Sequence, residues 1–337
     1  MPSNNEIHVA LASDDNYFEG LLTTVWSIAR NCSRPHQLIV NILDGGISPV
    51  NWNYLVSRLT PTKCTIRRLP INQDTFEGFQ SFHGTGKMAY ARLLLPDLLS
   101  DVTHVIYTDV DILWLADIAE LWDSIDEDAI MHISPGGSPP EELKWFSDHN
   151  YKWEKDKPFC SGMVIMNLAK FRREKLHLKM LDTITLNGGA LPLADQTAMN
   201  VHMFGRTDKV RLDPRWQLTS GGQAALPPAG FVIHFCGDAP WKSVSRSHHM
   251  ITDQHLLWHR YHAEAHEGTI WSSLHLGNTT AQIVIGRLLY ILAVNLSPVR
   301  TFLHLVMIMK GKGASIHCLD YYLHKFKPPR QTGKHYW

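Results

Sequence analysis

Cysteine is scarce in this 337-residue chain, and its five cysteines are widely spaced and odd in number. No two of them form a Cys-x-x-Cys pair, so the sequence predicts neither a disulfide framework nor a zinc knuckle. The polar segment 1–5 leads straight into an apolar stretch, without the charged and apolar regions of a secretory signal. These features favour a reducing cytoplasm as the setting of the protein.

The chain also lacks an excess of charge, because 32 lysines and arginines balance 32 aspartates and glutamates. A formally neutral chain is not expected to be a general nucleic-acid binder. The charge is unevenly placed, however. Residues 281–337 hold eight basic side chains and one acid, a net +7, which leaves −7 for the other 280 residues. An acidic body with a basic tail predicts a tail that meets an anionic surface.

No apolar run is long enough to span a bilayer, which takes about 18 residues without charges. The apolar stretch 282–309 is interrupted by Arg287, Asn295, Pro298, Arg300 and His304. Two short amphipathic helices, followed by basic and aromatic residues, fit an anchor that lies in the plane of a membrane surface. The alternative, in which 281–309 completes the hydrophobic core, stays open.

Three widespread site motifs are missing as well. There is no Gly-x-Ser-x-Gly serine elbow, and no Gly-x-Gly-x-x-Gly follows the first apolar strand. The stretch 84–87 is not a phosphate loop. Ser81 stands where the Walker pattern needs glycine, and Met88 stands where it needs serine or threonine.

What the sequence does contain is an alternation of apolar strands and amphipathic helices. With 44% hydrophobic residues it can bury one large or two modest cores. The first five elements read β-α-β-α-β, which predicts an α/β fold with a mostly parallel sheet and right-handed crossovers. The predicted strands are 7–12, 38–43, 64–69, 103–108, 163–167 and 231–233. The predicted helices are 17–30, one from Pro49, 87–95 ending at Pro96, one up to 186 and one from Asp195. The segment 133–158 is predicted to be an irregular loop that acts as a lid.

The predicted strand 103–108 leads directly into Asp109-Val110-Asp111. Alternate residues of a strand point the same way, so the two carboxylates can converge just past the strand end. Converging carboxylates are costly unless a cation shares them, and hard divalent ions prefer oxygen ligands. Ligands of open α/β sheets bind at this edge, where a metal can neutralise a diphosphate. A second Asp-x-Asp, at 126–128, follows no apolar strand and is predicted to be a solvated turn.

Histidines supply two further candidates among the twenty in the chain. His234 follows an apolar strand and is followed closely by Gly237, which permits a tight turn. It therefore resembles Asp109 in its position at the end of a strand, although most single histidines are structural. His255, His259, His262 and His266 share one face if the segment is helical. No His-Glu-x-x-His arrangement supports a zinc enzyme there, so an exposed or interface-facing stripe is favoured over a zinc site.

Six motifs occur in the order found in glycosyltransferase family 8, which the chain therefore resembles over residues 6–245. They are the segments 11–17, 90–93, 107–111, 161–168, 195–196 and 234–237. The resemblance is greatest to bacterial lipooligosaccharide and lipopolysaccharide galactosyl- and glucosyltransferases, with glycogenin more distant. It implies a GT-A fold, a UDP-hexose donor, Mn²⁺ or Mg²⁺, and transfer with retention of anomeric configuration.

The same resemblance implies a role for individual residues. Asp109, Asp111 and His234 correspond to metal ligands, and Asp195 and Gln196 to catalytic residues, with Gln196 facing the anomeric carbon. Tyr17 corresponds to a residue that stacks on the uracil base. The implied donor-binding residues are Ala12, Asp14, Asn16, Tyr17, Arg92, Asp109, Val110, Asp111, Asp195, Gln196, Gly237 and Lys242.

The chain departs from the family pattern at three places. Cys160 stands where the family usually has an asparagine, and Thr197 where an aspartate is common. Lys242 lies beyond the tryptophan that normally follows the family's lysine. These changes affect the expected donor and rate more than the fold.

We therefore expect two regions: a GT-A catalytic domain over 1–250, and a helical, basic and aromatic segment over 251–337 that associates with an anionic membrane. The expected function is transfer of galactose or glucose from a UDP-sugar to a lipopolysaccharide, lipooligosaccharide or other surface glycan, at the inner face of the cytoplasmic membrane. A transfer-inactive UDP-sugar-binding subunit and a nucleotide-sugar hydrolase are the alternatives. Gln196 is a poor nucleophile, so a front-face route aided by the leaving phosphate stays open.

Overall fold

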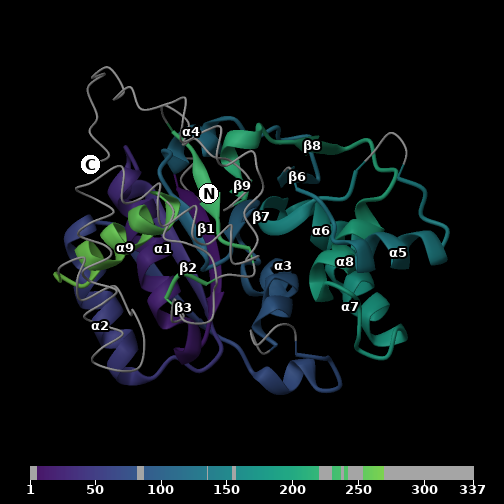
Figure 1. Ribbon diagram of the computed structural model, residues 1–337, viewed down its shortest axis with the longest axis horizontal. Coiled ribbons are helices and arrows are strands. Elements are labelled where there is room, and N and C mark those ends of the chain that lie inside the picture. Colours follow the sequence, from purple (N-terminus) through teal and green to yellow (C-terminus); the bar gives the residue numbers. More distant parts are fainter. Residues whose placement is uncertain are drawn as a thin grey trace, which may run out of the picture.

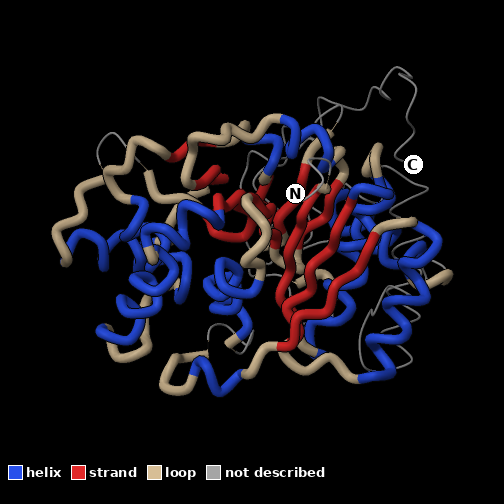
Figure 2. The backbone as a smooth tube through the Cα atoms, turned by 180° about the vertical axis from the view of Figure 1, so that it is seen from behind, coloured by secondary structure: helices blue, strands red, loops and turns tan. Residues whose placement is uncertain are grey.

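A computed structural model describes residues 6–81, 87–134, 136–153, 157–219, 230–236, 239–241 and 253–268. In these residues a central twisted sheet lies between helices on both of its faces (Figures 1 and 2). The arrangement is the α/β layering that the alternation of strands and helices predicts.

The central sheet has the strand order β3-β2-β1-β4-β7-β6-β8 among the described residues. Its first four strands run parallel, whereas β7 is antiparallel to both β4 and β6. The sheet is therefore mixed and mostly parallel, as predicted. The strands are β1 (Ile7–Ser13), β2 (Leu38–Asp44), β3 (Thr65–Pro70), β4 (His104–Thr108), β6 (Met131–Ser134), β7 (Cys160–Asn167) and β8 (Lys209–Arg211).

Strand β1 shows how the two faces are covered, because all of its residues are buried. Its alternate side chains Val9 and Leu11 belong to one hydrophobic cluster, and Ala10 and Ala12 to another. The first cluster includes residues of α1 (Phe18–Asn31), α2 (Pro49–Leu59), α4 (Ile118–Asp123) and α9 (Asp253–Ala265). The second includes residues of α3 (Leu95–Leu98), α6 (Leu168–Glu174), α7 (Leu176–Leu186) and α8 (Ala194–Met203). A strand covered on both faces reads as a continuous apolar run, which is why it was predictable.

A small second sheet was not predicted. Its order is β5-β10-β9, with bounds Ile112–Trp114, Val232–His234 and Leu218–Thr219. Strand β10 pairs antiparallel with β5, and His234 lies opposite Ile112. Because β5 begins directly after Asp111, this pairing brings a residue from late in the chain beside the Asp-x-Asp turn.

Proline explains two errors in the predicted elements. The segment 87–95 is a 3₁₀ helix (Met88–Leu94) followed by α3, and Pro96 lies in the first turn of α3. The prediction of an irregular loop over 133–158 is wrong, because β6 ends there and α5 (Pro140–Asp148) begins at a proline. Proline is tolerated in the first turn of a helix, where its missing N–H has no partner to lose.

The predicted helix ending at 186 is divided in two. Its parts α6 and α7 meet at Lys175, whose φ of 52° is left-handed and interrupts the helix. Helix α2 begins at Pro49 as predicted, and Ser48 before it accepts a hydrogen bond from the Asn51 amide.

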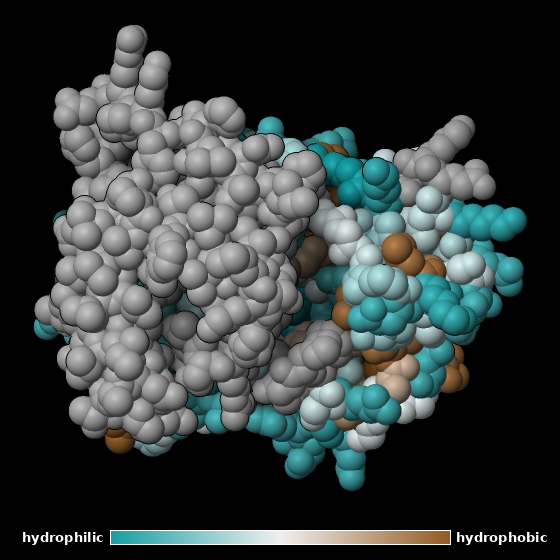
Figure 3. Space-filling model, viewed as in Figure 1, coloured by the Kyte–Doolittle hydropathy of each residue, from teal (hydrophilic) through white to brown (hydrophobic). Residues whose placement is uncertain are grey.

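The surface around α5, α7 and α8 mixes hydrophilic and hydrophobic side chains (Figure 3). Leu143, Leu178 and Leu186 are among its exposed residues. Single exposed leucines are ordinary on protein surfaces and define no docking face.

Within the part of the chain that the structure describes, no helix is both long and apolar enough to cross a membrane. The predicted anchor in 281–337 lies outside the described residues.

Candidate active site

The Asp109-Val110-Asp111 turn is held by backbone contacts at the carboxyl end of β4. The Asp109 amide donates to the Gly162 carbonyl at 2.7 Å. From α1, the Thr24 hydroxyl lies 2.8 Å from the carbonyl oxygens of both Val110 and Ile112. The turn is therefore fixed by neighbours on two sides before any ligand binds.

Asp109, Asp111 and His234 converge at this turn as predicted. One ligand atom from each lies within 4.8 Å of the others, and His234 Nε2 is 3.2 Å from Asp111 Oδ1. The His234 ring packs so closely on Gly162 that a Cβ there would lie 2.2 Å from its Cε1. Glycine at position 162 thus leaves the space that the imidazole occupies.

The electrostatics of this cluster fit a cation. Burial and the neighbouring charge of Asp111 raise the pKa of Asp109 to about 7, against the opposing effect of Arg92. Asp111 Oδ1 is buried and makes no aligned hydrogen bond, although His234 is near it. Two oxygen ligands and one imidazole match the preferences of Mn²⁺, and Mg²⁺ accepts the carboxylates. The residues present therefore fit a divalent ion.

Arg92 links this cluster to a second one. Its guanidinium lies 2.8 Å from Asp109 Oδ1 and 2.9 Å from Asp195 Oδ2, and 4.2 Å from the centre of the Tyr107 ring. Burial opposes its charge, but the two carboxylates raise the pKa of Arg92. The Arg92 side chain is 4% exposed, so most of its hydrogen-bond donors are directed at groups inside the protein.

Gln196, in the first turn of α8, is positioned by two partners. Its Oε1 accepts from the Ser161 amide at 3.1 Å, and its Nε2 donates to Glu142 Oε2 at 3.1 Å. Glu142 is fully buried on α5, and its Oε1 also accepts from the Thr197 hydroxyl at 2.8 Å. Burial raises the pKa of Glu142.

Sequence reasoning missed Glu142. It lies inside the segment predicted to be irregular, and no motif marks it. The one available signal was indirect: Thr197 replaces an aspartate that is common in the resembled family, and the carboxylate beside Gln196 comes from Glu142 instead.

The residues implied for uridine lie together at the end of β1. Asp14 accepts hydrogen bonds from the backbone and side-chain nitrogens of Asn16, at 2.9 and 3.2 Å. Tyr17 packs edge-on against Trp241, with ring centres 5.6 Å apart. Ala12 is buried just before them. Gly237 and Lys242, both predicted donor contacts, lie outside the described residues.

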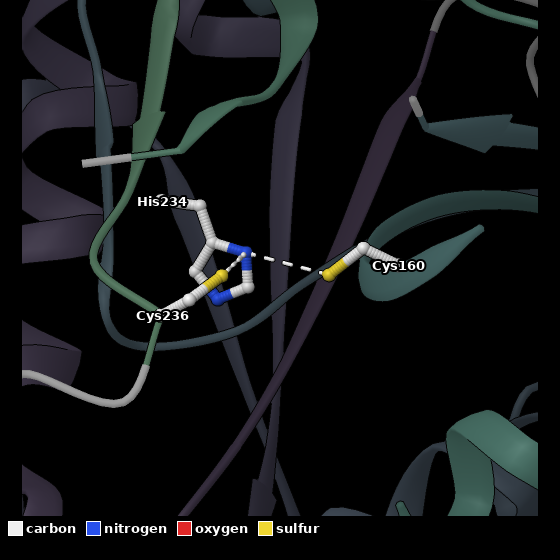
Figure 4. Close-up of side chains that lie close together, drawn as sticks. All are labelled: Cys160, His234 and Cys236. Carbon is white, nitrogen blue, oxygen red and sulfur yellow. Dashed lines mark hydrogen bonds between the residues drawn. The ribbon is translucent and has the colours of Figure 1, made fainter. Parts of the chain in front are cut away.

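Two cysteines meet on the other side of His234 (Figure 4). Cys160 Sγ lies 3.6 Å and Cys236 Sγ 3.1 Å from His234 Nδ1. The two cysteines are 76 positions apart in the chain, so no sequence spacing indicated this cluster.

His262, on α9, and His266, directly after α9, contact α1, so this part of the predicted stripe is packed inside the protein. His262 Nε2 and His266 Nε2 lie 2.7 and 2.8 Å from Glu19 Oε2. His259 is buried as well. The His255 side chain lies outside the described residues.

The other Asp-x-Asp behaves as predicted. Residues 126–128 are exposed, and the Asp126 carboxylate accepts the Asp128 amide within a turn.

A mixed α/β sheet with converging carboxylates and a histidine at the strand ends defines the class of GT-A glycosyltransferases. The model of glycosyl transferase family 8 matches residues 8–245, and the chain belongs to this family. It is thus a glycosyltransferase, as the resemblance implied.

The chain is also similar to individual proteins. General stress protein A of Bacillus subtilis is 27% identical over 285 residues, 77% of this chain and 96% of that protein. Glycosyltransferase GlyF of Streptococcus pneumoniae is 23% identical over 199 residues, 58% of this chain and 45% of GlyF. The galactosyltransferase LgtC, solved with donor and acceptor sugar analogs, matches with TM-score 0.63 at 22% identity, over 78% of this chain and 96% of LgtC.

Proposed function

We propose that this glycosyltransferase is retaining and metal-dependent, and that it moves galactose or glucose from a UDP donor to a surface glycan such as a lipopolysaccharide or lipooligosaccharide. The observation that carries the proposal is the joining of two clusters by Arg92. Asp109 of the Asp109–Asp111–His234 cluster and Asp195, next to Gln196, both contact this guanidinium. The similarity to a galactosyltransferase supports a hexose donor.

The chain's own residues divide the work as follows. Asp14, Asn16 and Tyr17 form the uridine end of the site, and the Tyr17 ring offers a face for the base. Asp109, Asp111 and His234 hold the divalent ion, which supplies electrostatic stabilisation of the charge that develops on UDP. Asp195 recognises sugar hydroxyls, and Gln196 faces the anomeric carbon. The Gln196 amide is held in place by its hydrogen bond to Glu142, so it needs little reorganisation when the donor binds.

The test is product analysis with UDP-galactose and UDP-glucose, with and without a glycan acceptor and with and without chelator. Chelation should abolish transfer, Mn²⁺ should restore it, and Asp111→Asn should lower turnover at least about 100-fold. Full activity of Asp111→Asn in chelator contradicts the metal assignment. Release of free hexose regardless of acceptor indicates a hydrolase, and donor binding without either product indicates a binding subunit.

We further propose that the protein works at the cytoplasmic face of the membrane and that the expected 251–337 segment attaches to it through residues 281–337, because α9, at the start of this segment, is packed against α1. The net +7 of residues 281–337 supports attraction to anionic lipids. Lipid-linked acceptors lie at this surface, so attachment raises their concentration near the site.

A further inference from the structure

We propose that Cys160, Cys236 and His234 Nδ1 form a second cation site, which takes a thiophilic divalent ion such as Zn²⁺. The three ligand atoms lie within 4.8 Å of one another. Cys160 comes from β7, and His234 and Cys236 come from the end of β10 and the residues after it (Figure 4). This site is distinct from the carboxylate cluster, because it uses the other nitrogen of the same imidazole.

The separations suit a tetrahedral ion. With Zn–S near 2.3 Å and Zn–N near 2.05 Å, tetrahedral sulfur and nitrogen ligands stand roughly 3.5 Å apart. The two Sγ–Nδ1 distances are 3.6 and 3.1 Å, so the ligands need only small shifts. Without an ion, hydrogen bonds link Cys160, Cys236 and His234 Nδ1 to one another. A cation accepts all three ligands at once.

The surroundings fix the site and leave it accessible. Cys160 packs against the backbone at Gly136, where an added Cβ would lie 2.7 Å from the Cys160 Cβ. Gly162 leaves the space for the His234 ring. Cys236 is exposed, which gives the ion a path from solvent. Two thiolates and one imidazole select a soft or borderline ion over Mg²⁺.

Sharing His234 has a consequence that rests on the proposed function. A neutral imidazole has one lone pair, so an ion on Nδ1 leaves the proton on Nε2. Nε2 is the nitrogen beside Asp111, 3.2 Å from its Oδ1. Zn²⁺ on the cysteines therefore removes a ligand from the Mn²⁺ site. The two ions exclude each other, and zinc acts as an inhibitor of transfer.

The site itself is tested with Co²⁺, whose thiolate charge-transfer absorption reports sulfur ligation. Titration of the reduced full-length protein should saturate this absorption at one Co²⁺ per chain, and Zn²⁺ should displace it. Cys160→Ser and Cys236→Ser should each weaken Co²⁺ binding at least about 100-fold, more than the loss of an outer-shell partner costs. Cys64→Ser, which changes a cysteine outside the cluster, should bind like the parent. No absorption, or absorption that survives both cluster substitutions, overturns the proposal.

The mutual exclusion of Zn²⁺ and Mn²⁺ is tested by the electron paramagnetic resonance signal of free Mn²⁺. Zn²⁺ should release Mn²⁺ from the parent and from Cys64→Ser, but not from Cys236→Ser at the same concentration. Simultaneous binding of both ions overturns the shared-histidine step. Asp111→Asn should lose Mn²⁺ yet keep the cobalt–thiolate absorption. If the parent shows cobalt–thiolate absorption but binds no Mn²⁺, the thiolate site is supported and the proposed metal dependence of transfer is wrong.

Discussion

At the scale of single residues, Glu142 on α5 supplies the carboxylate beside Gln196, where the family commonly has an aspartate at the position of Thr197. The residue after Gln196 is Thr197, whose hydroxyl donates to Glu142 instead of supplying a charge itself. The same carboxylate accepts from Gln196 Nε2. Because Glu142 is fully buried, these two donors fix its position, and it fixes the orientation of the Gln196 amide.

Glu142→Gln should therefore lower turnover about 10- to 100-fold with little change in UDP affinity. A glutamine has one acceptor oxygen where the carboxylate offers two, one to Gln196 and one to Thr197, so the orientation of the Gln196 amide is no longer fixed. Steady-state kinetics and UDP titration measure the split between kcat and binding. Glu141→Gln, an exposed change on the same helix, is the control and should leave both unchanged. Parent turnover in Glu142→Gln contradicts the positioning role.

Gly162 offers a second test, by steric means alone. Gly162→Ala places a Cβ 2.2 Å from His234 Cε1, so the imidazole has to move. We expect loss of Mn²⁺ binding and a stability cost of about 1–3 kcal/mol from overpacking. Gly137→Ala is the matched control, because no atom lies within 4 Å of its added Cβ. Mn²⁺ affinity and thermal unfolding measure the two effects. Unchanged Mn²⁺ affinity in Gly162→Ala shows that His234 is not a required ligand.

At the scale of elements, what could be predicted depended on whether local sequence decides the structure. Strands β1, β2 and β4 are buried on both faces, so their apolar runs were sufficient. Strand β9 has two residues and is set by pairing with β10, so local sequence does not reveal it. The convergence of Asp109 with Asp111 followed from strand geometry, whereas His234 was assigned to them by the resemblance to the family. Glu142 was not predictable as a site neighbour, and neither was the meeting of Cys160 with Cys236, because only the tertiary fold brings these side chains together.

The contact between α1 and α9 makes a prediction at this scale. Glu19 is half-buried between His262 and His266; burial raises the pKa of its carboxyl, but the two histidines lower it well below its usual range. A depressed carboxyl pKa stabilises the fold above the unfolded pKa of about 4.3, and the contribution is lost as the pH falls toward the folded pKa.

Glu19→Gln should thus lower the Tm at pH 6 by on the order of 2 °C, and this difference should shrink steadily below about pH 4. Thermal unfolding across pH 3–7 measures it. Glu77→Gln, an exposed change away from the helix pair, should show no pH-dependent difference. A Glu19→Gln difference that is constant across the range contradicts the ionic basis of the contact.

At the scale of the whole molecule, net charge is separated along the chain, because residues 281–337 carry +7 and the other 280 residues carry −7. The family match ends at residue 245, so the basic segment lies outside it. Helix α9 lies between the two and packs on α1 through Ala265. Truncation before residue 281 removes none of the residues that the structure describes.

Deletion of residues 281–337 should give a folded protein that still binds UDP and no longer sediments with anionic vesicles. The full-length protein should sediment and be partly released by high salt, because each basic residue near an anionic surface contributes about 1 kcal/mol that salt screens. A full-length variant with Lys310, Lys312, Lys325 and Lys327 changed to glutamine separates the two forces. It keeps the apolar stretch 282–309 and four of the eight basic residues, so its vesicle binding should weaken and depend less on salt. Unfolding of the truncated protein, or indifference of the full-length protein to anionic vesicles, assigns the stretch to the hydrophobic core instead.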